Sequence, residues 1–215
     1  MPVAARVTQF LHTLGQQILL DPATTLSQHL CAWFDYYQCL HIILKRHHAF
    51  QAAYVRTLTR HRHQRHALSH GRPHPHEAVQ AAGTESETLR LELLRETRSF
   101  YVFAGFVLDR IAHVFVRYFA LPWSRTEATH AQLTRLFQAL CQHKALVLPQ
   151  DDIVTLMHTL HTCLDDYPTT LQDIASHDPA QAMPLIDRYI MAMLEMFELN
   201  FAQSVFSSGD RAQLT

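Results

Sequence analysis

The sequence has few glycines. It has five in 215 residues, about 2% where about 7% is usual. Sandwiches, barrels and doubly wound sheets need many glycine turns, so this count argues against all three classes. No two of the glycines are close together. This excludes a glycine-rich phosphate loop, and with it nucleotide sites of the P-loop and Rossmann types.

Redox, targeting and membrane features are also missing. The four cysteines form no CxxC pair, which predicts reduced, buried thiols rather than a zinc knuckle or a redox pair. The N-terminal residues show no signal peptide, because no small-residue cleavage pattern follows them. The strongest apolar run, Phe100–Leu108, is much shorter than the ~20 residues that span a bilayer. We therefore expect a cytoplasmic protein with no membrane contact, and we assign it no cofactor.

Acidic residues are absent between Asp35 and Glu77. That stretch contains seven Lys and Arg and nine of the 17 histidines. From Asp151 onward the balance reverses, with ten Asp and Glu against Arg188 and Arg211. Two interpretations are open: the two halves complement each other, or the basic stretch binds an anionic partner such as RNA or DNA.

The chain carries helical periodicity and no alternating strand pattern. Apolar residues recur every three or four positions, so we predict an all-α fold. It should be one domain over 1–215, a helical bundle of six or seven helices. The segment 98–119 is apolar nearly all round and should be the central helix. Its buried residues are expected to be Phe103, Phe106, Leu108, Ile111 and Phe115.

Capping and breaking residues suggest the helix boundaries. Four capping-box patterns predict helix starts, at Thr25, Thr84, Ser124 and Thr169. Two prolines and two glycines in 69–83 predict a mobile loop rich in His and Pro. The last helix begins at Pro179 or at Pro184, and the sequence leaves this choice open.

Six histidines lie in the sixteen residues from His61 to His76. Imidazole is a common metal ligand, and His70, His74 and His76 have usable spacings. Nearby arginines repel a cation, and the tract has no carboxylate, so a basic surface loop is the favoured interpretation and no metal site is assigned. A second pattern, His158 and His161 followed by Asp165, is interpreted as a solvated helix face. A metal-binding regulator stays an alternative.

Arginine precedes histidine by five or six residues at four places. The pairs are Arg56/His61, Arg60/His66, Arg65/His70 and Arg125/His130. This spacing resembles the Arg-x(4–6)-His motif of HEPN domains, which are helical-bundle ribonucleases. The resemblance implies an RNase or toxin in which Arg holds a phosphate and His serves acid–base chemistry.

A polar stripe interrupts the central helix. Asp109, His113 and Arg117 are four residues apart and so share a face. A base oriented by a carboxylate is a catalytic arrangement, so these three residues are the candidate catalytic set. A structural polar seam between helices is the alternative.

The sequence favours a non-enzymatic interaction module over an enzyme. Its candidate nucleic-acid-binding residues are Arg56, Arg60, Arg62, Arg65 and His66. RNA or DNA is the expected partner of that set, and a protein partner or a second copy of the chain is the alternative.

Overall fold

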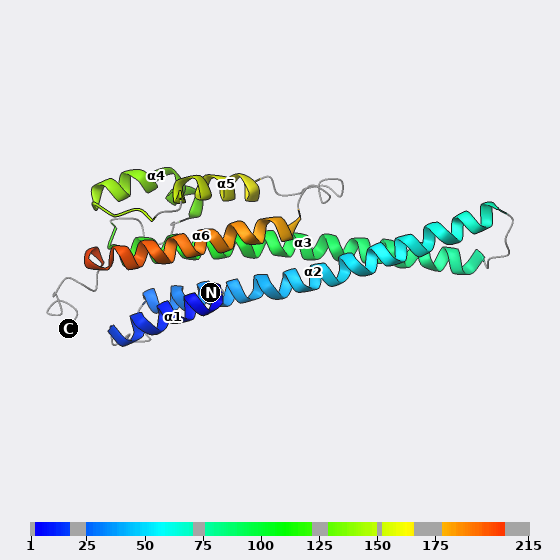
Figure 1. Cartoon of the computed structure of the whole chain (residues 1–215), viewed down its shortest axis with the longest axis horizontal. Coiled ribbons are helices and arrows are strands. Elements are labelled where there is room, and N and C mark those ends of the chain that lie inside the picture. Colours follow the sequence, from blue (N-terminus) through cyan, green and yellow to red (C-terminus); the bar gives the residue numbers. More distant parts are fainter. Residues whose placement is uncertain are drawn as a thin grey trace. The chain divides into compact units, whose positions relative to one another are not determined.

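The computed structural model describes residues 3–17, 25–70, 76–121, 129–149, 152–165 and 178–204. Over these residues the chain forms six α-helices and one 3-10 turn, and no strand (Figure 1). The predicted all-α class is therefore confirmed. The elements are α1 Val3–Gln17, α2 Thr25–Ser69, α3 His76–Tyr118, α4 His130–His143, α5 Ile153–Asp165, α6 Pro179–Leu199 and the 3-10 turn η2 Phe201–Gln203.

The chain divides into two compact units. Unit 1 comprises residues 1–39, 102–167 and 180–215, and unit 2 comprises residues 40–101 and 168–179. Unit 1 therefore holds α1, α4, α5 and nearly all of α6, with the first part of α2 and the last part of α3. The remainder of α2 and α3 forms a helical hairpin in unit 2. The expectation that the whole chain is one domain stays a prediction.

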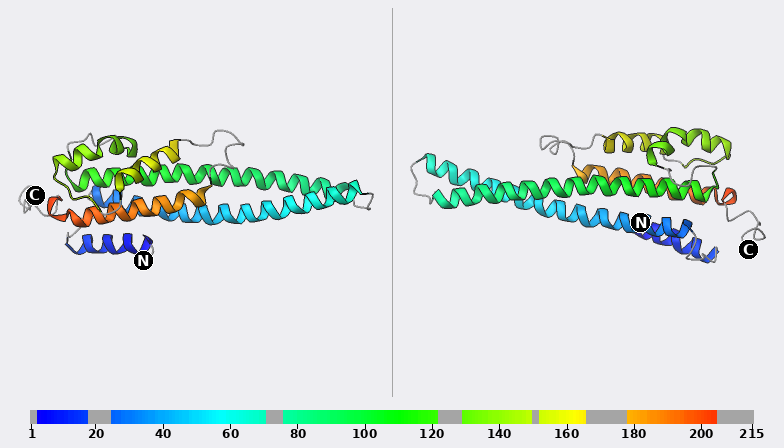
Figure 2. Two further views of the ribbon diagram at one scale, coloured as in Figure 1. Left: turned by 45° about the horizontal axis from the view of Figure 1, so that its top comes forward. Right: turned by 180° about the vertical axis from the view of Figure 1, so that it is seen from behind.

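Aromatic rings fill the interior of unit 1. Phe197 of α6 is fully buried, and its ring centroid lies 5.7 Å from that of Phe10 on α1. It also lies 4.9 Å from Tyr118, 6.4 Å from Phe115 and 6.1 Å from Phe119, all near the end of α3. The two views of Figure 2 agree that α3 and α6 run side by side. Phe197 therefore joins α1, α3 and α6 in one apolar cluster.

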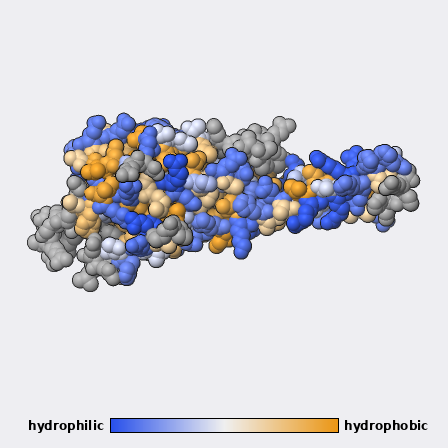
Figure 3. All heavy atoms as spheres, viewed as in Figure 1, coloured by the Kyte–Doolittle hydropathy of each residue, from blue (hydrophilic) through white to orange (hydrophobic). Residues whose placement is uncertain are grey.

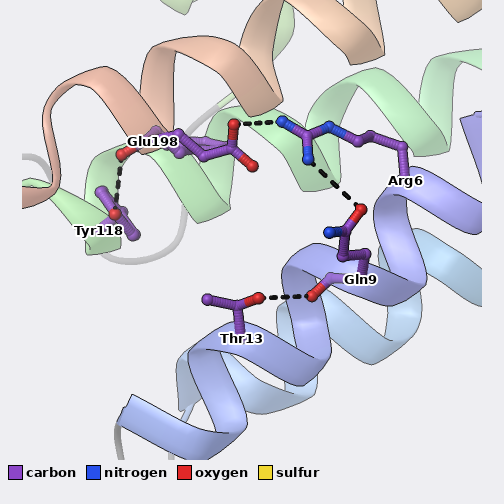
Figure 4. A network of polar contacts seen from close by, with 6 residues as sticks. Arg6, Gln9, Thr13, Tyr118 and Glu198 are labelled. Atoms are coloured by element: carbon purple, nitrogen blue, oxygen red, sulfur yellow. Dashed lines mark hydrogen bonds and ion pairs between the residues drawn. The ribbon is translucent and has the colours of Figure 1, made fainter.

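Polar contacts fix α6 against its neighbours at the edges of this cluster. Arg6 of α1 pairs with Glu198, as Figure 4 shows. The Tyr118 hydroxyl donates to the Phe197 carbonyl at 2.9 Å. On α2, the Tyr37 hydroxyl donates to Asp187 Oδ1 at 2.8 Å. Burial, and then this carboxylate, raise the pKa of Tyr37, so the phenol stays a donor.

The segment around α4 is held by side chains that cap or pin its backbone. Thr129 and Gln132 form a capping box at the start of α4. Beyond α4, Asn200 accepts from the Val147 amide at 2.6 Å and donates to the Val147 carbonyl at 2.8 Å. The predicted cap at Ser124 lies outside the described residues. The cap at Thr129 was not among the four predicted helix starts.

The burial predicted for the central helix is right for three residues and wrong for Phe106. Leu108, Ile111 and Phe115 are buried, whereas Phe106 is 45% exposed and Phe103 is half-buried. Phe106 and Phe115 are nine residues apart, which puts them about 180° apart around a helix. Because the segment is apolar nearly all round, composition alone did not identify its outer side.

Two expected helix boundaries are settled by the structure. The Thr84 start is wrong, since α3 begins at His76 and Thr84 bonds back to the Gln80 carbonyl at 3.1 Å, as a hydroxyl inside a helix does. Both α2, which ends at Ser69, and α3 extend into the predicted 69–83 loop, of which 71–75 lie outside the described residues. The last helix begins at Pro179 and contains Pro184. The helix predicted from Thr169 also lies outside the described residues.

Unit 2 buries several polar residues beside its apolar ones. Glu96 of α3 is buried and pairs with Arg46 of α2 at 2.6 Å. Glu85 accepts from the Thr57 hydroxyl at 3.3 Å and pairs with Arg60 at the same distance. On the face drawn in Figure 3 the surface of this hairpin is mainly hydrophilic.

Within the described chain, α3 is the one helix long and apolar enough to cross a membrane. More than half of its most apolar stretch is buried inside the protein, and the core helix of a soluble protein meets the same criterion.

Candidate functional site

The predicted nucleic-acid-binding residues lie on the part of α2 that belongs to unit 2. We call residues 45–66 the basic segment. It is one uninterrupted stretch of helix, so the histidine-rich sequence extends α2 rather than ending it. At 1.5 Å per residue it is about 32 Å long. Lys45, Arg56 and His63 lie within about 20° of one another around the helix, and all three are exposed.

Carboxylates of α3 neutralise some of the arginines in the basic segment. Arg46 pairs with Glu96, and Arg60 pairs with Glu85. By contrast, Arg56, Arg62 and Arg65 are exposed, and none of them forms an ion pair within the described part of the chain. These three therefore provide most of the permanent charge offered to an anion, whereas Arg60 provides less than the sequence suggested.

His66, the fifth predicted residue, lies at the end of the basic segment. Its ring stacks on His70 at 4.2 Å between centroids. Its carbonyl accepts from the Ser69 hydroxyl at 2.8 Å and lies 2.9 Å from His70 Nδ1. Because a carbonyl oxygen only accepts, His70 Nδ1 carries the proton. His66 thus takes part in the hydrogen bonds that end α2, and its imidazole is exposed.

The arginine–histidine pairs suggested a ribonuclease, but the helix points the two members of a pair in different directions. Residues five or six apart on an α-helix point about 120–140° away from each other. Arg56 is exposed, whereas His61 is half-buried against Gly83, where an added Cβ would lie 3.5 Å from His61 Nε2. In the last pair His130 is only 4% exposed, and Arg125 lies outside the described residues. No single pair therefore presents both groups on one side of α2.

Asp109 is the first residue of the predicted catalytic stripe and contacts the start of α4. Its Oδ1 accepts from the backbone amide of His130 at 2.8 Å, so this carboxylate supports the start of α4. His113 Nδ1 lies 2.8 Å from the carbonyl of Asp109, not from its carboxylate. The expected carboxylate–imidazole pair is therefore not formed. Arg117 shares the same side of α3 and is half-buried.

His130, which Asp109 anchors, is buried against α6. Its ring meets Tyr189 edge to face at 5.3 Å between centroids. Burial, and secondarily the charge of His161, lower the pKa of His130 to about 3. Neither His130 Nε2 nor the Tyr189 hydroxyl has a hydrogen-bond partner among the described residues. His130 is therefore a neutral core residue at ordinary pH.

Metal-ligand geometry is not found in the described residues, where no group of three His, Cys, Asp or Glu side chains could hold an ion. His158 is exposed and His161 is half-buried on α5. His74 of the histidine tract lies outside the described residues. The absence of an assigned metal or cofactor stays a prediction.

Several polar residues that matter in the structure escaped the sequence reasoning. Glu96 and His47 are buried in unit 2, and nothing in their local pattern distinguishes them from surface residues. The sequence could have identified Arg110, because Arg110, His113 and Arg117 follow an i, i+3, i+7 spacing that places them on one side of a helix. Its partner His29 lies 81 residues away in sequence and gave no such indication.

The chain matches none of the known protein families, curated proteins or solved structures with which it was compared.

Proposed function

We propose that the protein is a non-enzymatic helical interaction module whose basic segment on α2 binds nucleic acid through the phosphate backbone. The observation that carries the proposal is the exposure of Arg56, Arg62 and Arg65 without carboxylate partners in the described chain. Exposed cations along one rigid helix favour an extended polyanion over a small ligand.

The expected binding is electrostatic and independent of base sequence. Phe50 and Tyr54, the aromatic residues of the basic segment, are both half-buried. They therefore offer no exposed platform on which bases could stack. His63 and His66 are exposed, and histidines gain charge as the pH falls from 8 to 6. Affinity should consequently rise at the lower pH and fall with added salt.

The test is binding of RNA and of DNA at pH 6 and pH 8, each at two salt concentrations. The variant changes Arg56, Arg62 and Arg65 to Gln. The matched control changes Arg90, Arg95 and Arg98 to Gln, which removes the same charge from α3 of unit 2. Each lost phosphate contact lowers the slope of log affinity against log salt by about 0.9 for duplex DNA. Arg56 lies about 180° from Arg65 around α2, so one duplex contacts at most two of the three arginines. The α2 variant should therefore reduce the slope by about 0.9–1.8, and the control much less.

Three results would contradict the proposal. The first is that the native protein binds neither RNA nor DNA at pH 6 and low salt. The second is that the two triple variants weaken binding equally, which would mean that only net charge matters. The third is that the native protein cleaves RNA and the His66→Ala or His130→Ala variant does not, which would establish the ribonuclease alternative instead.

A further inference from the structure

Arginine and histidine side chains converge in unit 1, where the first part of α2 meets the last part of α3. The rings of His29 on α2 and His113 on α3 stack with centroids 4.9 Å apart and planes 28° apart. Arg110 Nη1 lies 3.0 Å from His29 Nδ1, and the Arg110 guanidinium lies over the Tyr36 ring, 5.9 Å from its centroid. We call His29, Arg110, His113 and Arg117 the cationic cluster. All four are half-buried, so solvent reaches them.

The two contacts of this cluster fix the tautomers of its histidines. A guanidinium only donates, so Arg110 donates to His29 Nδ1 and the proton of neutral His29 is on Nε2. A carbonyl oxygen only accepts, so His113 donates through Nδ1 to the Asp109 carbonyl at 2.8 Å. Nε2 of His113 is then the nitrogen left to meet a ligand, which is the usual state of a histidine oriented by a backbone carbonyl.

The charges that shift the pKa of His29 are all positive. Burial, followed by the positive charges of His113, Arg110 and Arg117, lowers the pKa of His29 to about 4. No carboxylate of the described chain contributes to this shift. Asp109, the acidic residue on the same helix, directs Oδ1 to the His130 amide. Burial disfavours a charge of either sign, whereas the positive charges of Arg110 and Arg117 beside His29 attract an anion.

We propose that the cationic cluster is a binding site for a phosphate-class anion, either free phosphate or the phosphoryl group of a small monoester. Arg110 keeps several guanidinium donors beyond the one it gives to His29, and its planar fork matches two phosphate oxygens. His113 Nε2 and His29 Nε2 are the additional donors when protonated. This site is in unit 1 and does not depend on the nucleic-acid binding proposed for unit 2.

The experiment is calorimetric titration of the full chain with inorganic phosphate at constant ionic strength, chloride being the reference anion. Arg110→Gln should weaken phosphate binding about tenfold or more. Arg110→Lys keeps the charge but loses the fork, and should give an intermediate affinity. Arg135→Gln is the matched control, since Arg135 is an exposed arginine of α4, and it should bind like the native chain.

Methyl phosphate distinguishes the two sources of the anion. Equal affinity for phosphate and methyl phosphate assigns the site to free phosphate, and tighter binding of the ester assigns it to a monoester. The variant with Arg56, Arg62 and Arg65 changed to Gln should bind phosphate like the native chain. Its loss of phosphate binding would show that the anion is held in unit 2, and would overturn this proposal.

Nitrogen-15 NMR of the native imidazoles keeps the proposal testable even if an Arg110 variant fails to fold. Without phosphate, His29 should be protonated on Nε2 and His113 on Nδ1. Added phosphate should shift both sets of resonances and raise the pKa of His29 by about one unit. Unchanged histidine resonances at saturating phosphate, or equal phosphate affinity of native and Arg110→Gln chains, would overturn the site.

Discussion

The interiors of the two units differ in kind. Among the described residues, unit 1 buries Trp33, Phe115, Phe137 and Phe197 together with many aliphatic side chains. In unit 2 the buried apolar residues include Leu40, Ile43, Ala82, Leu94, Phe100 and Tyr101. Nearly as many polar residues are buried with them, namely His47, Thr57, Ser86, Glu96 and Thr97.

This contrast means that α2 and α3, which run through both units, are stabilised differently in each unit. Burial of apolar area is the dominant source of stability, and it is concentrated in unit 1. The hairpin of unit 2 relies more on pairs such as Arg46–Glu96, whose net contribution is small but whose loss is costly. Its outer surface holds the basic segment. The larger apolar core and the basic segment therefore lie mainly on different parts of α2 and α3.

The largest effect is expected from emptying the aromatic cluster of unit 1. Phe197→Ala removes a fully buried ring that contacts α1 and α3, and should lower the free energy of unfolding by about 3–5 kcal/mol. Phe106→Ala, at a 45% exposed position, should lower it by less than about 1 kcal/mol. Denaturant melts followed by circular dichroism measure both. Equal losses would mean that the buried aromatic cluster contributes no more to stability than an exposed position of α3.

Acid should destabilise the protein through histidines that are buried in the neutral form. The pKa of His130 is lowered to about 3, so between pH 6.5 and 3 the unfolded chain binds a proton that the folded chain does not. Its contribution is complete above pH 6.5 and is lost as the pH falls. At about 1.4 kcal/mol per pH unit, stability should drop by roughly 2–3 kcal/mol between pH 6.5 and 4.5 from this residue.

Two other histidines should also make the protein less stable as the pH falls. Burial lowers the pKa of His29 to about 4 and also lowers that of His47, which belongs to unit 2. His130→Gln should reduce the slope of stability against pH by about one proton. His158→Gln, at an exposed position of α5, serves as control and should leave the slope unchanged. A slope that His130→Gln does not alter would place the acid sensitivity elsewhere.

A smaller effect is expected at the Arg46–Glu96 ion pair of unit 2. Arg46→Gln leaves the buried Glu96 carboxylate without its cation. Because the Arg46 side chain is 55% exposed, we expect a loss of about 1–2 kcal/mol rather than the full cost of a buried charge. The double variant with Glu96→Gln should recover part of this loss. Additive losses in the double-variant cycle would show that the pair is not coupled.

Sequence reasoning succeeded where a property repeats along the chain and failed where one contact decides. Helical periodicity identified the all-α class, and an apolar run identified the buried part of α3. It did not distinguish the outer position of Phe106, because neighbouring apolar residues cover every side of that helix. The capping pattern at Thr84 was misleading, because the Ala- and Glu-containing residues before it favour helix.

At the candidate site, the sequence located the charged residues but not their partners on other helices. The sequence identified the basic segment, since its arginines occur together. It overvalued Arg60, whose neutralising Glu85 lies 25 residues away on another helix. It paired His113 with the carboxylate of Asp109, whereas a contact with the distant His130 amide draws that carboxylate away. Spacing along one helix predicts a shared face, but partners on other helices set the protonation and charge.

The smallest expected effect compares helical glycines of the two units. Gly105 lies in unit 1, and a Cβ built there meets nothing within 4 Å. Gly83 lies in unit 2, where the same Cβ would touch His61 at ordinary van der Waals distance. Glycine inside a helix costs about 0.8–1 kcal/mol relative to alanine. Gly105→Ala should therefore stabilise the protein by about that amount, and Gly83→Ala by the same amount or somewhat less. Thermal melts measure both changes. Destabilisation by Gly83→Ala alone would mean that the helices of unit 2 are packed as closely as a core, and it would remove the contrast between the two units.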